Sequence, residues 1–137
     1  MAQIERRFID EMVAHARDDL PNECCGILAG QDGRILKLYR MTNVAASPFR
    51  FSMDPREIAQ VDIQAGNNGW DLLAIYHSHT RSEAYPSDTD VRLAAGTSQL
   101  WPDVRYVLLS LMDPDNLQVR LFRVHGGAVT EEPLEII

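Results

Sequence analysis

Two histidines separated by one residue, His77 and His79, end an apolar run, and Ser87 and Asp90 follow them. Residues i and i+2 of an extended chain point to the same side, so both imidazoles are expected to project together with Ser78 turned away. Two imidazoles and one carboxylate leave a coordination position open for water, the pattern of a catalytic rather than a structural zinc site. Zinc lowers the pKa of such a water towards ~7. The spacing therefore predicts a Zn²⁺ site formed by His77, His79 and Asp90.

A hydrolase of this kind also needs a side chain that takes a proton from water and passes it to the leaving amine. Glu23 is the best candidate, because it directly precedes an apolar segment that begins at Cys25, where a buried carboxylate could face a cleft. Spacing alone does not choose Glu23 over Glu83.

The pattern H-x-H-x(7)-S-x-x-D from His77 to Asp90 resembles the JAMM motif of the Mov34/MPN/PAD-1 metallopeptidases, the JAMM/MPN+ family, and matches it at every position. The block from Pro21 to Leu28 is similar to the usual setting of that family's upstream glutamate. The resemblance covers most of the chain, with softer similarities at Phe51 to Pro55 and at Trp101 to Val107.

The resemblance implies that His77, His79 and Asp90 are metal ligands, that Glu23 is the general acid/base, and that Ser87 donates a hydrogen bond to the tetrahedral intermediate. It implies an α/β/α sandwich similar to cytidine deaminases, with a mixed sheet flanked by helices. Enzymes of the family cleave a peptide or isopeptide bond after the C-terminal Gly-Gly of ubiquitin-like proteins, and small bacterial members trim cysteine or other adducts from sulfur-carrier proteins. We therefore expect the tail of a ubiquitin-like or sulfur-carrier protein as substrate. The chain leaves no room for the long insertions that grip ubiquitin in eukaryotic deubiquitinases.

Other functions compete with this interpretation. Ser87-x-x-Asp90 also matches a helix capping box, and both roles can hold together. A metal-free MPN scaffold for protein assembly is the alternative function, but scaffolds of that kind have lost motif residues that are all present here. A structural zinc domain would need four protein ligands, and the sequence offers three. A cytidine deaminase would need H-x-E followed by P-C-x-x-C, which the chain lacks.

The remaining histidines and cysteines are interpreted as ordinary residues. His15 falls on the first predicted helix and His125 adjoins a Gly-Gly turn. Cys24 and Cys25 are adjacent, so they cannot form an ordinary stabilising bridge, and packed thiols are expected. Two cysteines without a stabilising bridge indicate a protein that works in a reducing cytoplasm.

Composition limits the classes of partner. The 137 residues suit one domain, residues 1–137, and 13 Lys and Arg against 20 Asp and Glu give a formal net charge of −7. Such an acidic chain lacks the excess of basic residues that binding to nucleic acid or to an anionic membrane surface requires. No apolar run approaches the ~20 residues of a membrane span, and the N-terminus lacks the apolar core of a signal peptide. The acidic stretch from Glu131 to Glu135 is expected to be a solvated end.

Helical and strand patterns alternate along the chain, which predicts an α/β domain. Ile4, Phe8, Met12 and Ala16 recur at helical spacing. Asp54 and Pro55 are typical of a helix start, and Asp32-Gly33 of a hairpin turn. The predicted helices cover Ile4 to Leu20, Pro55 to Gly66 and Ser87 to Ala95. The predicted strands are Cys25 to Ala29, Ile35 to Tyr39, Phe49 to Met53, Leu72 to Tyr76, Tyr106 to Leu111, Gln118 to Val124 and a last one near Val129.

Overall fold

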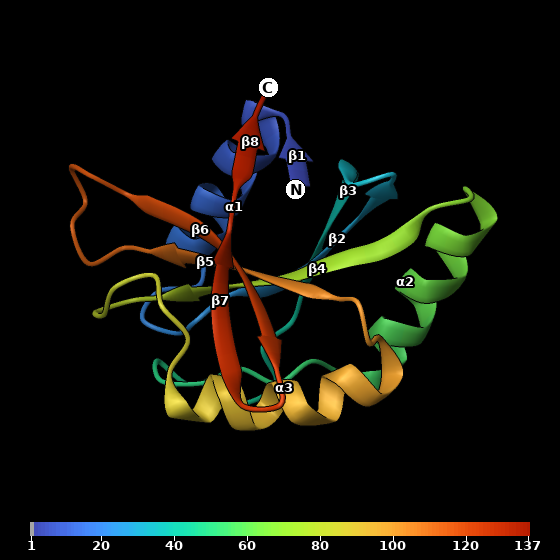
Figure 1. The fold of residues 1–137 in the computed structure, drawn as a ribbon. Helices are drawn as coiled ribbons and strands as arrows, with labels where there is room; N and C mark the ends of the chain where they lie inside the picture. The colour runs from blue at the N-terminus through green and yellow to red at the C-terminus, as the bar shows by residue number, and fades with distance from the viewer. Residues whose placement is uncertain (1) are drawn as a thin grey trace.

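The chain folds into one eight-stranded sheet with helices on both of its faces (Figure 1), as seen in a computed structural model that describes residues 2–137. No helix in this range combines the length and apolar character needed to cross a bilayer. In chain order the elements are β1 (Ala2–Ile4), α1 (Arg6–Asp18), β2 (Cys25–Gln31), β3 (Arg34–Met41), α2 (Pro55–Asn67), β4 (Asp71–His79), α3 (Asp88–Leu100), β5 (Arg105–Ser110), β6 (Gln118–His125), β7 (Ala128–Glu132) and β8 (Leu134–Ile136).

The sheet is mixed, with the strand order β7-β6-β5-β4-β2-β3-β1-β8. The hairpin predicted around Asp32-Gly33 is confirmed as β2 and β3, and both turn residues have positive φ. Strands β4 and β5 are parallel neighbours, and α3 supplies the crossover that a parallel pair requires. The predicted α/β class with a mixed sheet is thus confirmed.

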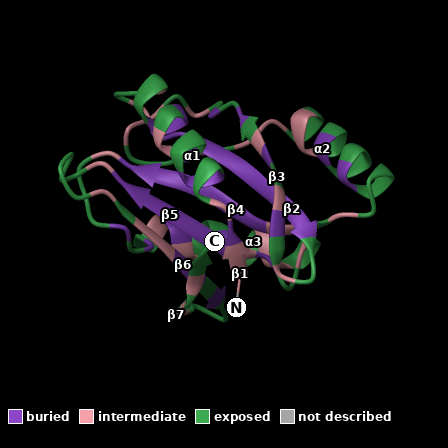
Figure 2. Ribbon diagram, turned by 90° about the horizontal axis from the view of Figure 1, so that it is seen from above, coloured by how far each residue is buried: buried purple, intermediate pink, exposed green. Residues whose placement is uncertain are grey.

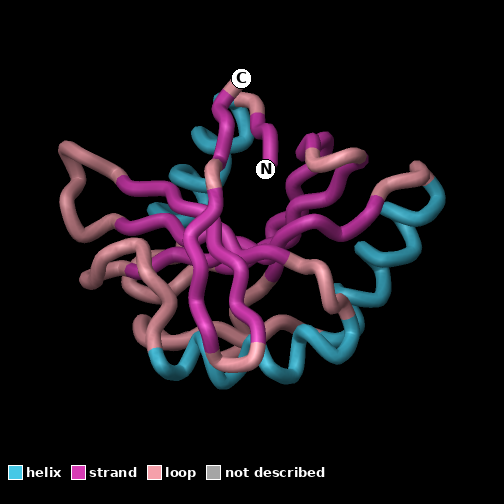
Figure 3. Tube along the Cα trace, in the orientation of Figure 1, coloured by secondary structure: helices cyan, strands magenta, loops and turns pink. Residues whose placement is uncertain are grey.

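Side chains of the central strands alternate between two helical layers, because successive residues of a strand point to opposite faces. Leu28 and Tyr76 pack with helix α1 in one core cluster. Ile75 packs with α3 residues on the other face, and Ile27 packs there with α2 residues. Figure 3 shows the helices on either side of the strands, and Figure 2 shows burial concentrated in the central strands. This is the predicted α/β/α sandwich.

Tyr76 occupies the centre of the α1 face and is fully buried. Its hydroxyl lies 2.7 Å from Nδ1 of His15, whose Nε2 faces Asp19 at 3.4 Å. The Tyr76 ring also covers Gly26 on the neighbouring strand so closely that a Cβ there would overlap the ring. His15 is therefore a core residue with partners, in agreement with its interpretation as an ordinary histidine.

The predicted strand from Phe49 to Met53 is wrong. Only Met53 forms a bridge, with Asn43, and the rest of the segment is loop. The backbone N–H of Ser52 is bound by the side chain of Asn43 and its carbonyl by the N–H of Val44. The segment is therefore folded around a side chain instead of joining the sheet.

Strands β1 and β8, at the two ends of the chain, were not predicted. Ile4 ends strand β1 instead of lying on the first helix, and β1 pairs in parallel with β8. The acidic stretch from Glu131 to Glu135 is largely exposed, as expected of a solvated end, and it also contributes to β7 and β8. Its charge is partly neutralised by ion pairs, Glu131 with Arg120 at 2.7 Å and Glu132 with Arg105 at 2.6 Å.

Candidate metal centre and active site

The end of strand β4 places His77 and His79 on one face of the sheet. The strand is paired on both sides, and His77 lies opposite Cys25 of β2 and Leu108 of β5. Ser78 points to the other face, where its hydroxyl accepts a hydrogen bond of 2.9 Å from the backbone N–H of Cys24. The predicted alternation is confirmed, and it fixes His77 where the strand is paired on both sides and His79 at the strand end, where it pairs with β5.

Asp90 lies in the first turn of α3, and the capping box predicted as a possible role of Ser87-x-x-Asp90 is formed. The Ser87 hydroxyl oxygen accepts from the backbone N–H of Asp90 at 3.1 Å. Asp90 Oδ2 accepts from the backbone N–H of Ser87 at 2.9 Å. The capping bond uses Ser87 only as an acceptor, so its hydroxyl proton remains available to a further partner.

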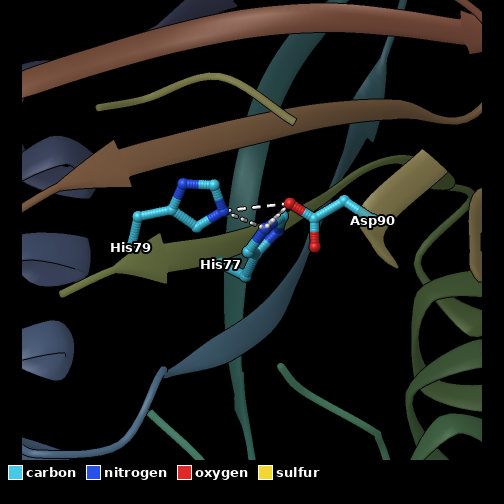
Figure 4. A group of neighbouring side chains, drawn as sticks. All are labelled: His77, His79 and Asp90. Atoms are coloured by element: carbon cyan, nitrogen blue, oxygen red, sulfur yellow. Dashed lines mark hydrogen bonds and ion pairs between the residues drawn. The ribbon is translucent and has the colours of Figure 1, made fainter. Parts of the chain in front are cut away.

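Three ligand atoms converge in this region. Figure 4 shows the rings of His77 and His79 and the carboxylate of Asp90 turned towards one another. The two Nε2 atoms lie 3.3 Å apart, and Asp90 Oδ2 is 3.1 Å from that of His77 and 2.9 Å from that of His79. Ligands at the 2.0–2.1 Å zinc–nitrogen distance in a tetrahedron are separated by roughly 3.3 Å. The triangle therefore has the dimensions of one face of a tetrahedral zinc site.

Neighbouring groups orient the histidine rings. Nδ1 of His79 lies 2.8 Å from the backbone carbonyl oxygen of Glu83. An N–H donated there leaves the Nε2 lone pair facing the centre, as metal-binding histidines commonly require. The ring of His77 stacks on Phe51 with centroids 4.5 Å apart. Both rings are thus held with Nε2 towards Asp90.

Buried polar atoms without a hydrogen-bond partner gather around the centre. Among the described residues they include Asp90 Oδ1, Glu23 Oε1 and His77 Nδ1. Two of these are carboxylate oxygens, and unpartnered buried acceptors are costly unless a cation or donor compensates them. The donor set of two imidazoles and carboxylate oxygen therefore fits a divalent metal ion.

Mutual contacts also shift the ionisation of these groups. Burial by itself raises the pKa of Asp90, but the close contacts of its carboxylate with the rings of His77 and His79 outweigh it and lower that pKa well below its usual range. Burial lowers the pKa of His77. A charged carboxylate facing a neutral imidazole is the ionisation state in which both residues can bind a metal.

Glu23 lies in the loop before β2 and is only 3% exposed. Burial raises the pKa of its carboxyl group to about 8, with the nearby Asp90 adding to the rise and His79 opposing it. A carboxyl group with a pKa near neutrality can both accept and donate a proton at working pH. Glu83 differs, because its side chain is exposed and its backbone carbonyl faces His79.

A pocket of about 240 Å³ opens beside Glu23, His79 and Ser87. Its remaining walls come from two loops, one contributing Pro48 and Phe49 and the other contributing Thr80, Arg81 and Ser82. The structure thus brings the five predicted residues into one region, with three of them lining the pocket and His77 and Asp90 buried behind it.

Sequence reasoning missed Asn43, which holds one wall of this pocket. The Asn43 side-chain amide donates to the backbone carbonyls of Glu23 at 2.9 Å and Arg50 at 3.1 Å. Its oxygen accepts from the backbone N–H groups of Ala45 at 3.1 Å and Ser52 at 3.0 Å. One buried side chain therefore ties the loop that carries Pro48 and Phe49 to the backbone of Glu23. The available signal was the tendency of Asn to bind nearby backbone groups in loops.

Cys24 and Cys25 are fully buried, as expected of packed thiols. Burial raises the pKa of both, that of Cys24 to about 12. A thiol must ionise to attack a carbonyl, so neither cysteine is an activated nucleophile.

Known proteins resemble the chain over nearly its full length. Residues 5–124 match the sequence model of the family described as prokaryotic homologs of the JAB domain. The CysO-cysteine peptidase of Mycobacterium tuberculosis is 43% identical over 136 residues, which cover 98% of this chain and 90% of that protein. The desampylase of Haloferax volcanii is 35% identical over 108 residues, 74% of each chain. A protein of Desulfitobacterium hafniense of known solution structure superposes with a TM-score of 0.89 at 36% identity, covering 100% of this chain and 93% of that one.

Proposed function

The chain belongs to the prokaryotic JAB-domain family, and on that premise we propose that it is a zinc-dependent peptidase or isopeptidase acting after the C-terminal Gly-Gly of a ubiquitin-like or sulfur-carrier protein. The observation that carries the proposal is the buried triangle of His77, His79 and Asp90 beside Glu23. Similarity to a CysO-cysteine peptidase over 98% of the chain supports a small adduct as the group removed.

His77, His79 and Asp90 would hold the metal through the three atoms that already converge. When bound, the ion lowers the pKa of water and polarises the carbonyl of the bond to be cleaved. The His79 contact with the Glu83 carbonyl and the Ser87 contact with Asp90 keep these ligands oriented.

Glu23 would move the proton. Its carboxylate takes a proton from the attacking water and delivers it to the nitrogen of the leaving amine, which departs as a free amine. Burial supports this role, because a carboxyl group with a pKa of about 8 is a better proton acceptor than an ordinary glutamate once ionised. Hydrogen bonds at its backbone N–H, to Ser47, and at its carbonyl, from Asn43, fix the position of the residue.

Ser87 would donate its free hydroxyl proton to the substrate oxygen as negative charge develops there. Its capping contact leaves this proton unused. A donor positioned for the developing charge lowers the barrier more than it strengthens substrate binding.

The substrate tail cannot extend the sheet beside His77, because β4 is paired on both sides at that residue. The tail would instead cross the end of the strand, over the pocket between Pro48-Phe49 and Thr80–Ser82. Glycine at the cleaved bond has no side chain, so its backbone can approach the centre closely.

The test gives the zinc-loaded protein a carrier bearing cysteine after Gly-Gly, beside a di-ubiquitin control, and follows both by mass spectrometry. Loss of the cysteine with little cutting of di-ubiquitin is expected, and Glu23→Gln should be inactive in the same assay. Efficient cleavage of unrelated short peptides with survival of the carrier adduct would show a general peptidase. Survival of every substrate although zinc is bound would favour the alternative function, a catalytically silent scaffold for protein assembly.

A further inference from the structure

One cationic side chain lines the pocket beside the candidate active site. Of the described residues that form its walls, Arg81 is the single Arg or Lys, and it shares the pocket with Glu23, His79 and Ser87. The chain carries a formal charge of −7, so a cation at this position opposes the general field of the molecule.

The Arg81 guanidinium has no acidic partner. No Asp or Glu within residues 2–137 forms an ion pair with it, and it is exposed. Other surface arginines also lack an ion pair, but none of them lines this pocket. Arg81 is therefore free to bind an anion that enters beside Glu23.

The position of Arg81 limits which part of a substrate it can reach. It follows the ligand His79 by two residues, where the chain leaves β4 and bends, so the two Cα atoms lie within about 7 Å of each other. A guanidinium on a long side chain can extend from there over the atoms next to the cleaved bond. It is suited to a carboxylate, because its planar N–H groups can bind both carboxylate oxygens together.

A single-residue adduct differs from the other conjugates by the main-chain carboxylate that it carries in that place. A Gly-Gly tail offers neutral backbone groups, and a lysine side chain joined through an isopeptide bond carries no carboxylate near its nitrogen. A single amino acid attached after Gly-Gly carries its α-carboxylate two bonds from the leaving nitrogen, about 2.5 Å away. A cation in the wall of the pocket would thus distinguish a single-residue adduct from a longer peptide or a protein conjugate.

We propose that Arg81 binds the free α-carboxylate of the residue being removed, and that this contact makes the enzyme selective for carriers extended by one amino acid. The inference rests on the proposed function, since it names the group released in that reaction. It makes Arg81 a specificity-determining residue with no part in moving protons or holding the metal.

The experiment compares two carriers that end in Gly-Gly-Cys and differ only in the terminus, a free carboxylate in one and a carboxamide in the other. The zinc-loaded protein should cleave the free acid with a kcat/KM about 10- to 100-fold above that of the amide, as expected for a lost charge-assisted contact. Arg81→Gln should lower the rate on the acid more than the rate on the amide and bring the ratio of the two close to one. Arg81→Lys, which keeps the charge, should restore part of the preference.

Arg123→Gln is the matched control, because it removes the same charge from an exposed position of β6, away from the pocket. A binding measurement with the Glu23→Gln protein adds a readout independent of turnover: affinity for the acid should exceed that for the amide, and Arg81→Gln should erase the difference. Equal cleavage of acid and amide by the parent protein would overturn the role of Arg81 and leave the proposed function intact. A preference that survives in Arg81→Gln would also overturn it. Failure of the parent protein to cleave either carrier would refute the proposed function itself.

Discussion

Replacing Glu23 with Gln should stabilise the zinc-free protein at alkaline pH while it removes activity. The carboxyl group is 3% exposed, its Oε1 has no hydrogen-bond partner, and burial raises its pKa from the ordinary 4.5 to about 8. Gln has nearly the same shape but never ionises, so it avoids the cost of a buried charge. It also cannot accept a proton from water, and we expect activity to fall by about 10²- to 10⁴-fold.

The magnitude follows from linkage between protonation and folding. Below pH 4.5 the carboxyl group holds its proton in both folded and unfolded chains, so ionisation costs nothing. Between pH 4.5 and 8 the unfolded chain releases the proton and the folded chain retains it, so the free energy of unfolding falls as pH rises. Each pKa unit corresponds to about 1.4 kcal/mol, which gives a full cost of roughly 3 to 5 kcal/mol above pH 8.

Urea unfolding of the chelator-treated proteins at pH 5 and pH 9 measures this cost. The difference between Glu23→Gln and the parent should grow by roughly 3 to 5 kcal/mol between the two pH values, and constant effects of the substitution cancel in that comparison. Glu83→Gln is the control, because it changes an exposed carboxylate of a neighbouring loop and should shift stability by less than about 0.5 kcal/mol. The same pH dependence in the parent and in Glu23→Gln would refute the argument that the carboxyl group is buried and uncompensated.

Three further outcomes are expected. Elemental analysis of the parent should find about one zinc per chain, and His77→Ala and Asp90→Ala should each lose it, because either change removes one of three converging ligand atoms. Undiminished zinc in either variant would refute the ligand assignment. Ser87→Ala should lower kcat more than it raises KM, and it should lower the free energy of unfolding in urea by about 1 kcal/mol because the hydroxyl also caps α3. Normal turnover with that loss of stability would leave Ser87 only its capping role. Asn43→Asp keeps the two contacts in which the side chain accepts but loses the hydrogen bonds that it donates to the carbonyls of Glu23 and Arg50. It should lower the free energy of unfolding in urea by about 1 to 3 kcal/mol and also lower kcat; an unchanged kcat would show that Asn43 does not position Glu23.

The grouping of His77, His79 and Asp90 could be predicted because these residues lie close together in sequence. His77 and His79 are related by strand periodicity, and Asp90 follows in the first turn of the next helix. Spacing could not select Glu23, because 53 residues lie between it and His77 and only the pairing of β2 with β4 brings the two segments together. The family resemblance supplied that choice, and burial of Glu23 against exposure of Glu83 agrees with it.

The missed features depend on contacts that local patterns do not encode. Strands β1 and β8 have three residues each, too short for a recognisable alternation, and they form through pairing between opposite ends of the chain. The apolar segment from Phe49 to Met53 has a strand-like composition, but Asn43 binds its backbone and makes it a pocket wall. No helical or strand periodicity in the sequence indicates where Arg81 lies, because the bend after β4 places it in the pocket.

The overlap between Gly26 and Tyr76 also constrains the order in which this sequence can change. A side chain at position 26 would meet the ring of Tyr76, and the ring has little freedom to move because it is fully buried and its hydroxyl is bound to His15. A lineage that places a larger residue at position 26 must therefore first reduce the side chain at position 76, and His15 then loses its partner. The two strands beside the candidate active site can consequently diverge at these positions only in that order, so a larger residue at position 26 that is tolerated in one descendant is expected to destabilise another that keeps Tyr76.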